Sequence, residues 1–81
     1  MNMIRDYRDK FGTGYGIEQA PEGFRWVWYE PGEPDEIGGW RATLSAALRN
    51  AAEDWDDCGT GGNRASVLRG AATKAERREQ G

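Results

Sequence analysis

The chain has 81 residues, a net charge of −3 and 37% apolar residues, which include four Trp, three Tyr and two Phe. A chain this short forms one small domain that buries only about 60% of its unfolded surface. Histidine is absent and Cys58 is the single cysteine, which excludes an internal disulfide, a cysteine-rich zinc site and the commonest general base. Without a signal peptide or a membrane-length apolar run, we expect a cytoplasmic protein with no membrane partner.

The N-terminal residues are expected to form a short helix. Asn2 would be its N-cap and Gly12 would follow its end. Ile4, Tyr7 and Phe11 would share one face. An extended arm is the alternative for the same residues.

Residues 15–19 and 24–29 both alternate in hydrophobicity, and they flank a turn-forming segment at 20–23 that contains Pro and Gly. Proline presets φ and glycine accepts a positive φ, so this pattern predicts an antiparallel hairpin. The core-facing aromatics of its second strand would be Phe24, Trp26 and Trp28.

The segment 30–36 contains two prolines, which indicate a loop, and its four acids make that loop acidic. Residues 39–42 are expected to form a third strand beside the second. A helix then follows, capped by Thr43 or Ser45 and ended by Gly59. Its apolar residues recur at the spacing of one helical face, and they are Leu44, Ala47, Leu48, Ala51, Ala52 and Trp55.

The last part of the chain is a glycine-rich linker followed by a segment that Asn63 could cap as a second helix. Its apolar stripe is weak and Gly70 interrupts it, so a frayed or partner-dependent element is expected. The fold class is therefore α+β: a small three-stranded antiparallel sheet packed on one amphipathic helix, with a short N-terminal helix and a C-terminal helix or tail. Residues 1–58 would form the α+β domain, and residues 59–81 the linker and the basic C-terminal segment.

No pattern in the chain predicts catalysis, a cofactor or a specific metal site. Cys58 has no histidine to activate it. The Gly59–Asn63 run follows a helix and lacks the ending of a phosphate-binding loop. The acids near residue 57 lack the alternate spacing of a calcium loop. Base stacking on Trp26 and Trp28 is opposed by their acidic surroundings, so core packing is the better interpretation.

Charge is concentrated in the middle of the chain. Residues 18–57 contain ten acids and three arginines, whereas residues 58–81 contain five cations and two acids. Acids in the last turns of a helix oppose its macrodipole by about 0.3–1 kcal/mol each, so stability alone does not account for them. The strand directions predict that the helix ends beside the 30–36 loop. Eight carboxylates would then converge on one end of the domain: Glu30, Glu33, Asp35, Glu36, Glu53, Asp54, Asp56 and Asp57.

This acidic end predicts a partner with a basic surface, because such a patch steers association with charge-complementary proteins. Tyr29 and Arg25 would lie on the other strand face and serve as interface anchors. Both features also have a purely structural interpretation. The strand face of Tyr29 and Arg25 would be an ordinary half-solvated sheet face, and the acidic end would be a solvated surface that is neutralised by Arg5, Arg8 and Arg64.

Residues 23–26 in the predicted hairpin, Gly39-Trp40, and the helical segments 43–48 and 51–55 resemble the small anti-CRISPR proteins that bacteriophages and mobile elements encode. The resemblance is one of size, acidity and style over about residues 13–57, and it transfers no site residue. It implies stoichiometric inhibition in the host cytoplasm, often by occupying a nucleic-acid or subunit surface of a CRISPR effector.

The leading hypothesis is a non-enzymatic inhibitor that binds a basic protein surface, such as that of a CRISPR effector subunit, and does not bind nucleic acid directly. One alternative is a nucleic-acid-binding or antitoxin-like regulator. It would use the basic C-terminal residues Arg64, Arg69, Lys74, Arg77 and Arg78. A homo-oligomeric structural phage protein is another, and a homodimer is compatible with the sequence.

Overall fold

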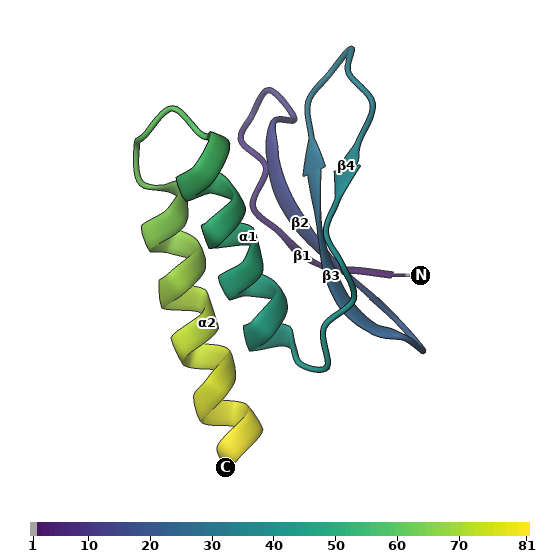
Figure 1. The fold of residues 1–81 in the computed structure, drawn as a ribbon, viewed down its shortest axis with the longest axis vertical. Coiled ribbons are helices and arrows are strands. Elements are labelled where there is room, and N and C mark those ends of the chain that lie inside the picture. The colour runs from purple at the N-terminus through teal and green to yellow at the C-terminus, as the bar shows by residue number, and fades with distance from the viewer. Residues whose placement is uncertain (1) are drawn as a thin grey trace.

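The computed structural model describes residues 2–81, which form four strands and two helices. They are β1 (Asn2–Asp6), β2 (Gly14–Ala20), β3 (Gly23–Tyr29), β4 (Glu36–Ile37), α1 (Leu44–Cys58) and α2 (Arg64–Gln80). The strands make one antiparallel sheet in the order β1-β2-β3-β4. Both helices lie on one side of it, with α1 between the sheet and α2 (Figure 1). The α+β class is confirmed.

The predicted hairpin is present as β2 and β3, which pair without interruption from Gly14–Tyr29 to Ala20–Gly23. Gly23 has a φ of +130°, and a Cβ there would overlap the carbonyl oxygen of Arg41. The hairpin turn therefore depends on glycine both for its backbone conformation and for the close approach of the 38–42 segment.

The expected N-terminal helix is wrong, because residues 2–6 form β1 on the edge of the sheet. A helix of fewer than about 12 residues is marginal in water, whereas pairing with β2 satisfies backbone groups of residues 2–6. The Asp9 carboxylate also accepts hydrogen bonds from the amides of Phe11 and Thr13, which competes with helix formation. Phe11, expected on an apolar face, is 72% exposed.

The third strand was expected at 39–42, but the structure places β4 at Glu36–Ile37. The chain does continue antiparallel to β3, and Arg41 exchanges two backbone hydrogen bonds with Phe24. Between these pairings the chain crosses the indole of Trp26 so closely that a Cβ on Gly38 would overlap the ring. This passage interrupts the ladder and leaves a short strand followed by an isolated bridge.

The core lies between the sheet and α1, as the sequence predicts. Buried side chains from β2 and β3 face a row of small residues on α1, and the Trp26 indole donates a hydrogen bond of 3.0 Å to Asn50. The buried members from these elements are Tyr15, Ile17, Trp26, Ala47, Leu48, Ala51 and Ala52. Thr43 caps α1 by accepting a hydrogen bond from the amide of Ala46. Alanines on this face let the helix approach the aromatic side of the sheet.

The C-terminal segment forms the helix α2, which packs against α1. Leu68, Ala72 and Ala75 are buried in the same core. In the last turn of α2, the Glu79 carboxylate accepts hydrogen bonds from the amide and hydroxyl of Ser45. It thereby satisfies donors in the first turn of α1. Within residues 2–81, neither helix is long and apolar enough to cross a membrane.

Candidate functional site: an acidic end with an aromatic cleft

The end of α1 and the end of β3, together with the loop and β4 that follow it, form a cleft with carboxylates on both sides. The cleft has a volume of about 400 Å³. Glu30 and Glu36 border it from the loop and β4, and Asp54 borders it from α1. The structure thus brings together members of the two acidic groups that the strand directions placed at one end.

Two tryptophans from different elements form the apolar part of this cleft. The rings of Trp28 and Trp55 are 5.5 Å apart between centroids, and Tyr15 meets both rings edge-on. The sequence assigned Trp28 and Trp55 to the core, but both are only partly buried. Their pairing could have been anticipated, since each lies near the end of an element directed to the acidic end.

A second cleft of about 400 Å³ adjoins the first on the loop side. Its acidic lining is Glu30, Glu33, Asp35 and Glu36, and Trp28 lines both clefts. The Trp28 indole donates a 3.2 Å hydrogen bond to Glu30. The acidic residues of this loop therefore surround an aromatic side chain and are not scattered along the surface.

Most of the eight carboxylates lack a cationic partner among the residues that the structure describes. Within residues 2–81, Asp56 alone among them forms an ion pair, with Arg69. Asp54 accepts a 2.6 Å hydrogen bond from the Tyr15 hydroxyl. The exposed acids whose carboxylates make no hydrogen bond or ion pair within the described residues are Glu33, Asp35, Glu36, Glu53 and Asp57.

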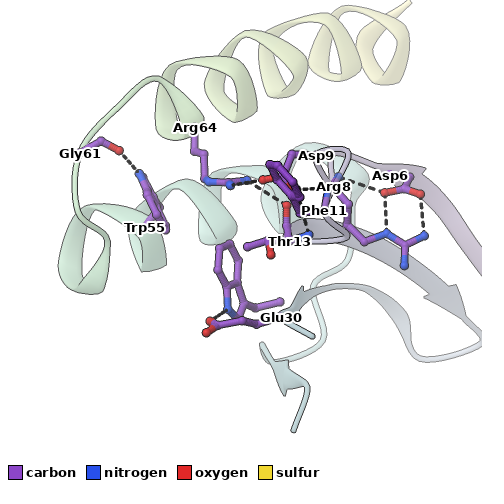
Figure 2. Close-up of polar contacts among 10 residues, drawn as sticks. Asp6, Arg8, Asp9, Phe11, Thr13, Glu30, Trp55, Gly61 and Arg64 are labelled. Carbon is purple, nitrogen blue, oxygen red and sulfur yellow. Dashed lines mark hydrogen bonds and ion pairs between the residues drawn. The ribbon is translucent and has the colours of Figure 1, made fainter. Parts of the chain in front are cut away.

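The arginines proposed to neutralise this end are used elsewhere. Arg8 pairs with Asp6 at 2.7 Å and holds the pKa of Asp6 at about 2. Arg64 pairs with Asp9 at 3.3 Å. Figure 2 shows Arg64 reaching from the first turn of α2 toward the 7–13 loop.

Arg5 forms no ion pair within residues 2–81, and the groove that it lines beside α2 contains none of the eight acids. The guanidinium of Arg64 does lie 5.3 Å from the ring centroids of both Trp28 and Trp55. It therefore contributes one stacked cation to the aromatic pair, but within residues 2–81 it forms no ion pair with the carboxylates of the acidic end.

The carboxylates of this end also act on Cys58, the exposed last residue of α1. Partial desolvation raises the pKa of its thiol, and the charges of Asp54, Glu36 and Asp57 raise it further. Glu36 belongs to β4 and the two aspartates to α1, so carboxylates of both groups act on the same position. A thiol with a raised pKa is a poor nucleophile near neutral pH.

The two predicted anchors, Tyr29 and Arg25, lie on the sheet face away from the helices and are already engaged. The Arg8 guanidinium stacks on the Tyr29 ring at 4.8 Å. Arg25 pairs with Glu18 at 3.0 Å and stacks on Trp40 at 4.5 Å. Tyr29 adjoins the acidic end, whereas Arg25 lies four residues back along β3, about 13 Å away. Of the two, only Tyr29 is placed near the acidic cleft.

Replacing Tyr15 with Phe is expected to lower the free energy of unfolding by about 1–2 kcal/mol. Tyr15 is 2% exposed and its hydroxyl donates to Asp54, so the variant loses a hydrogen bond to a charged group. Urea unfolding followed by circular dichroism measures the change. An unchanged midpoint would mean that water replaces this hydrogen bond without cost.

The effect of this substitution should also depend on pH. Burial, and then the hydrogen bond to Asp54, raise the pKa of Tyr15 above its usual value of about 10. A raised pKa in the folded state contributes stability that is complete below about pH 10 and is lost as the pH rises further. The stability difference between wild type and variant should therefore shrink above about pH 10.

Comparison of the chain with protein-family models, with curated proteins and with solved structures finds no match. Within residues 2–81, no three His, Cys, Asp or Glu side chains are grouped so as to hold a metal ion. What distinguishes this end chemically is negative charge without ion pairs beside two partly buried tryptophan rings. That combination suits a cationic side chain, which can form ion pairs and stack on the rings together.

Proposed function

We propose that the protein is a non-enzymatic binding protein whose acidic end occupies a basic surface of a partner protein. The observation that carries this proposal is the cleft in which Glu30, Glu36 and Asp54 surround the Trp28–Trp55 pair. An arginine or lysine of the partner would enter this cleft, while the unpaired acids around it would steer the approach.

The partner class that we propose is a nucleic-acid-handling protein, and binding would inhibit it by covering its nucleic-acid or subunit surface. Closely spaced carboxylates compete with a phosphate backbone for the same cations. The resemblance to anti-CRISPR proteins implies a CRISPR effector subunit as the target. Such an inhibitor acts stoichiometrically, so inhibition would saturate at a fixed ratio of inhibitor to target.

The alternative of direct nucleic-acid binding through the C-terminal helix has less support. Two of its five proposed cations are paired within the protein, Arg64 with Asp9 and Arg69 with Asp56. The net charge of the chain is negative, which opposes approach to phosphates.

The test is a charge-neutralised triple variant, Glu33→Gln, Glu36→Gln and Asp57→Asn. These side chains make no hydrogen bond or ion pair within residues 2–81, so the fold should be retained. The control is Glu22→Lys with Gln80→Lys, which changes the net charge equally at exposed positions outside the acidic end. Circular dichroism and unfolding midpoints check that both proteins fold normally.

Each protein is used as bait in a bacterial lysate, and association with a retained protein is then measured at several salt concentrations. Wild type and control should capture the same basic protein and compete with nucleic acid for it. The triple variant should associate about tenfold more slowly or worse, with a weaker dependence on salt. Equal association of all three with every retained protein would contradict the proposal.

A further inference from the structure

A groove separates the edge of the sheet from α2 on the side of the molecule away from β4. The backbone of α1 approaches β2 and β3, whereas that of α2 approaches α1 and no strand. Two adjoining cavities, of about 310 and 400 Å³, open between β1 and α2. Both are lined by Arg5, Leu44, Ala75 and Arg78, so they form one continuous groove.

The floor of this groove is apolar and its rim is cationic. Val67 and Ala71 of α2 and Tyr7 supply apolar surface, and Val67 is 47% exposed. Gly70 also lines the groove, and nothing lies within 4 Å of the position that its Cβ would occupy. The missing side chain keeps the middle of the groove open, although glycine inside a helix costs about 0.5–1 kcal/mol relative to alanine.

The rim consists of Arg5, Lys74 and Arg78. Among the ion pairs within residues 2–81, none involves these three side chains. Elsewhere on α2, Arg69 pairs with Asp56. Glu79 also lines the groove, where its carboxylate accepts hydrogen bonds from the amide and hydroxyl of Ser45. The groove therefore presents positive charge to a ligand while the opposite end of the molecule is acidic.

The groove also borders an open sheet edge. β1 is the first strand in the sheet order, and in the described part of the chain no strand pairs with its outer side. Such an edge exposes alternate amides and carbonyls that can pair with an added strand. Arg5 belongs to β1 and lines the groove, so a strand added here would direct alternate side chains toward α2.

We propose that this groove binds an extended acidic peptide segment of a partner protein, which adds a strand to β1. Its apolar side chains would rest on the floor near Gly70, and its carboxylates would pair with Arg5, Lys74 and Arg78. Three cations beside a narrow apolar floor fit a peptide better than a nucleic acid, because affinity for nucleic acid depends on the number of phosphates that cations neutralise.

The acidic loop of a second copy fits this edge less well. It contains Pro31 and Pro34, which lack amide donors. Their spacing is odd, so one of the two would face β1 in either register and break the ladder. The proposed occupant is therefore an acidic segment without proline.

The probe is a short fluorescent peptide in which valine and glutamate alternate, with fluorescence anisotropy as the readout. Arg78→Glu should weaken binding about tenfold or more, because it replaces an ion pair with repulsion. The matched control is Arg77→Glu, which makes the same charge change on α2 outside the groove and should leave binding within about twofold of wild type.

A second pair of variants tests the floor. Gly70→Phe should fill the groove and weaken binding about tenfold, whereas Gly70→Ala keeps most of the space and should bind like wild type. Methylation of alternate peptide amides removes the donors along one edge of the added strand, so one of the two possible methylation patterns should abolish binding. Hydrogen exchange of the β1 amides should slow when the unmodified peptide binds.

Several results would overturn the proposal. The proposal is wrong if the peptide does not bind, if Arg77→Glu and Arg78→Glu reduce its affinity equally, or if hydrogen exchange of the β1 amides does not slow. Tighter binding of a single-stranded oligonucleotide that Arg78→Glu abolishes would assign the groove to nucleic acid instead. Self-association in light scattering that Gly70→Phe removes would assign it to a second copy. Because the groove and the acidic cleft are separate surfaces, each proposal can fail without the other.

Discussion

Replacing Leu68 with Ala is expected to lower the free energy of unfolding by about 2–5 kcal/mol. Leu68 lies on α2 and is 1% exposed, within the core that α1 shares with the sheet. The whole domain is expected to have a stability of about 4–12 kcal/mol, so a large part of it would be lost. Urea unfolding followed by both circular dichroism and tryptophan fluorescence measures the change.

The matched control is Val67→Ala, the neighbouring position on the same helix, which is 47% exposed. It should change stability by no more than about 0.5 kcal/mol. If α2 belongs to the same cooperative unit as the sheet, the two signals of Leu68→Ala will shift together. An early loss of helical signal alone would show instead that residues 59–81 unfold as a separate segment.

This result also bears on how α2 is used in experiments. Removing residues 63–81 to test for nucleic-acid binding would delete Leu68, Ala72 and Ala75 from the core. It would also remove Glu79, which accepts hydrogen bonds from Ser45 in the first turn of α1. Loss of binding by such a truncation would not separate function from unfolding. Point variants at exposed positions on α2 are the sharper choice.

The sequence predicted those elements whose pattern is local. The alternation around the 20–23 turn was sufficient for the β2–β3 hairpin, and the regular spacing from Leu44 to Trp55 was sufficient for α1. The spacing of Ile4, Tyr7 and Phe11 was misleading. It fits a helical face, but a partner strand distant in sequence determines the conformation of residues 2–6. The position of β4 likewise depends on contact between Gly38 and the Trp26 ring.

The acidic end was predictable in outline, since it follows from chain direction alone. Its partners were not, because the pairing of Asp56 with Arg69 requires α2 to lie along α1. The weak apolar stripe of α2 gives no indication of that placement. The groove beside β1 was missed for the same reason, since it depends on an unexpected edge strand and on the position of α2.

Trp26→Ala is expected to be the most damaging substitution in the sheet, lowering the free energy of unfolding by about 3–5 kcal/mol. The side chain is 7% exposed and packs against Tyr15 at 5.6 Å between ring centroids. Its indole also donates to Asn50 of α1. Removing it leaves a cavity, an unpaired amide oxygen and a gap beneath Gly38.

Trp26→Phe separates these contributions, because it keeps an aromatic ring but cannot donate to Asn50. We expect it to lose about 1–2 kcal/mol, and the double variant with Asn50→Ala to lose less than the two single changes added together. Circular dichroism in urea is the suitable measurement, since fluorescence changes with the number of tryptophans. Strict additivity would mean that the hydrogen bond does not connect β3 to α1. In that case the relative placement of Glu30 and Asp54 at the acidic cleft would depend on packing alone.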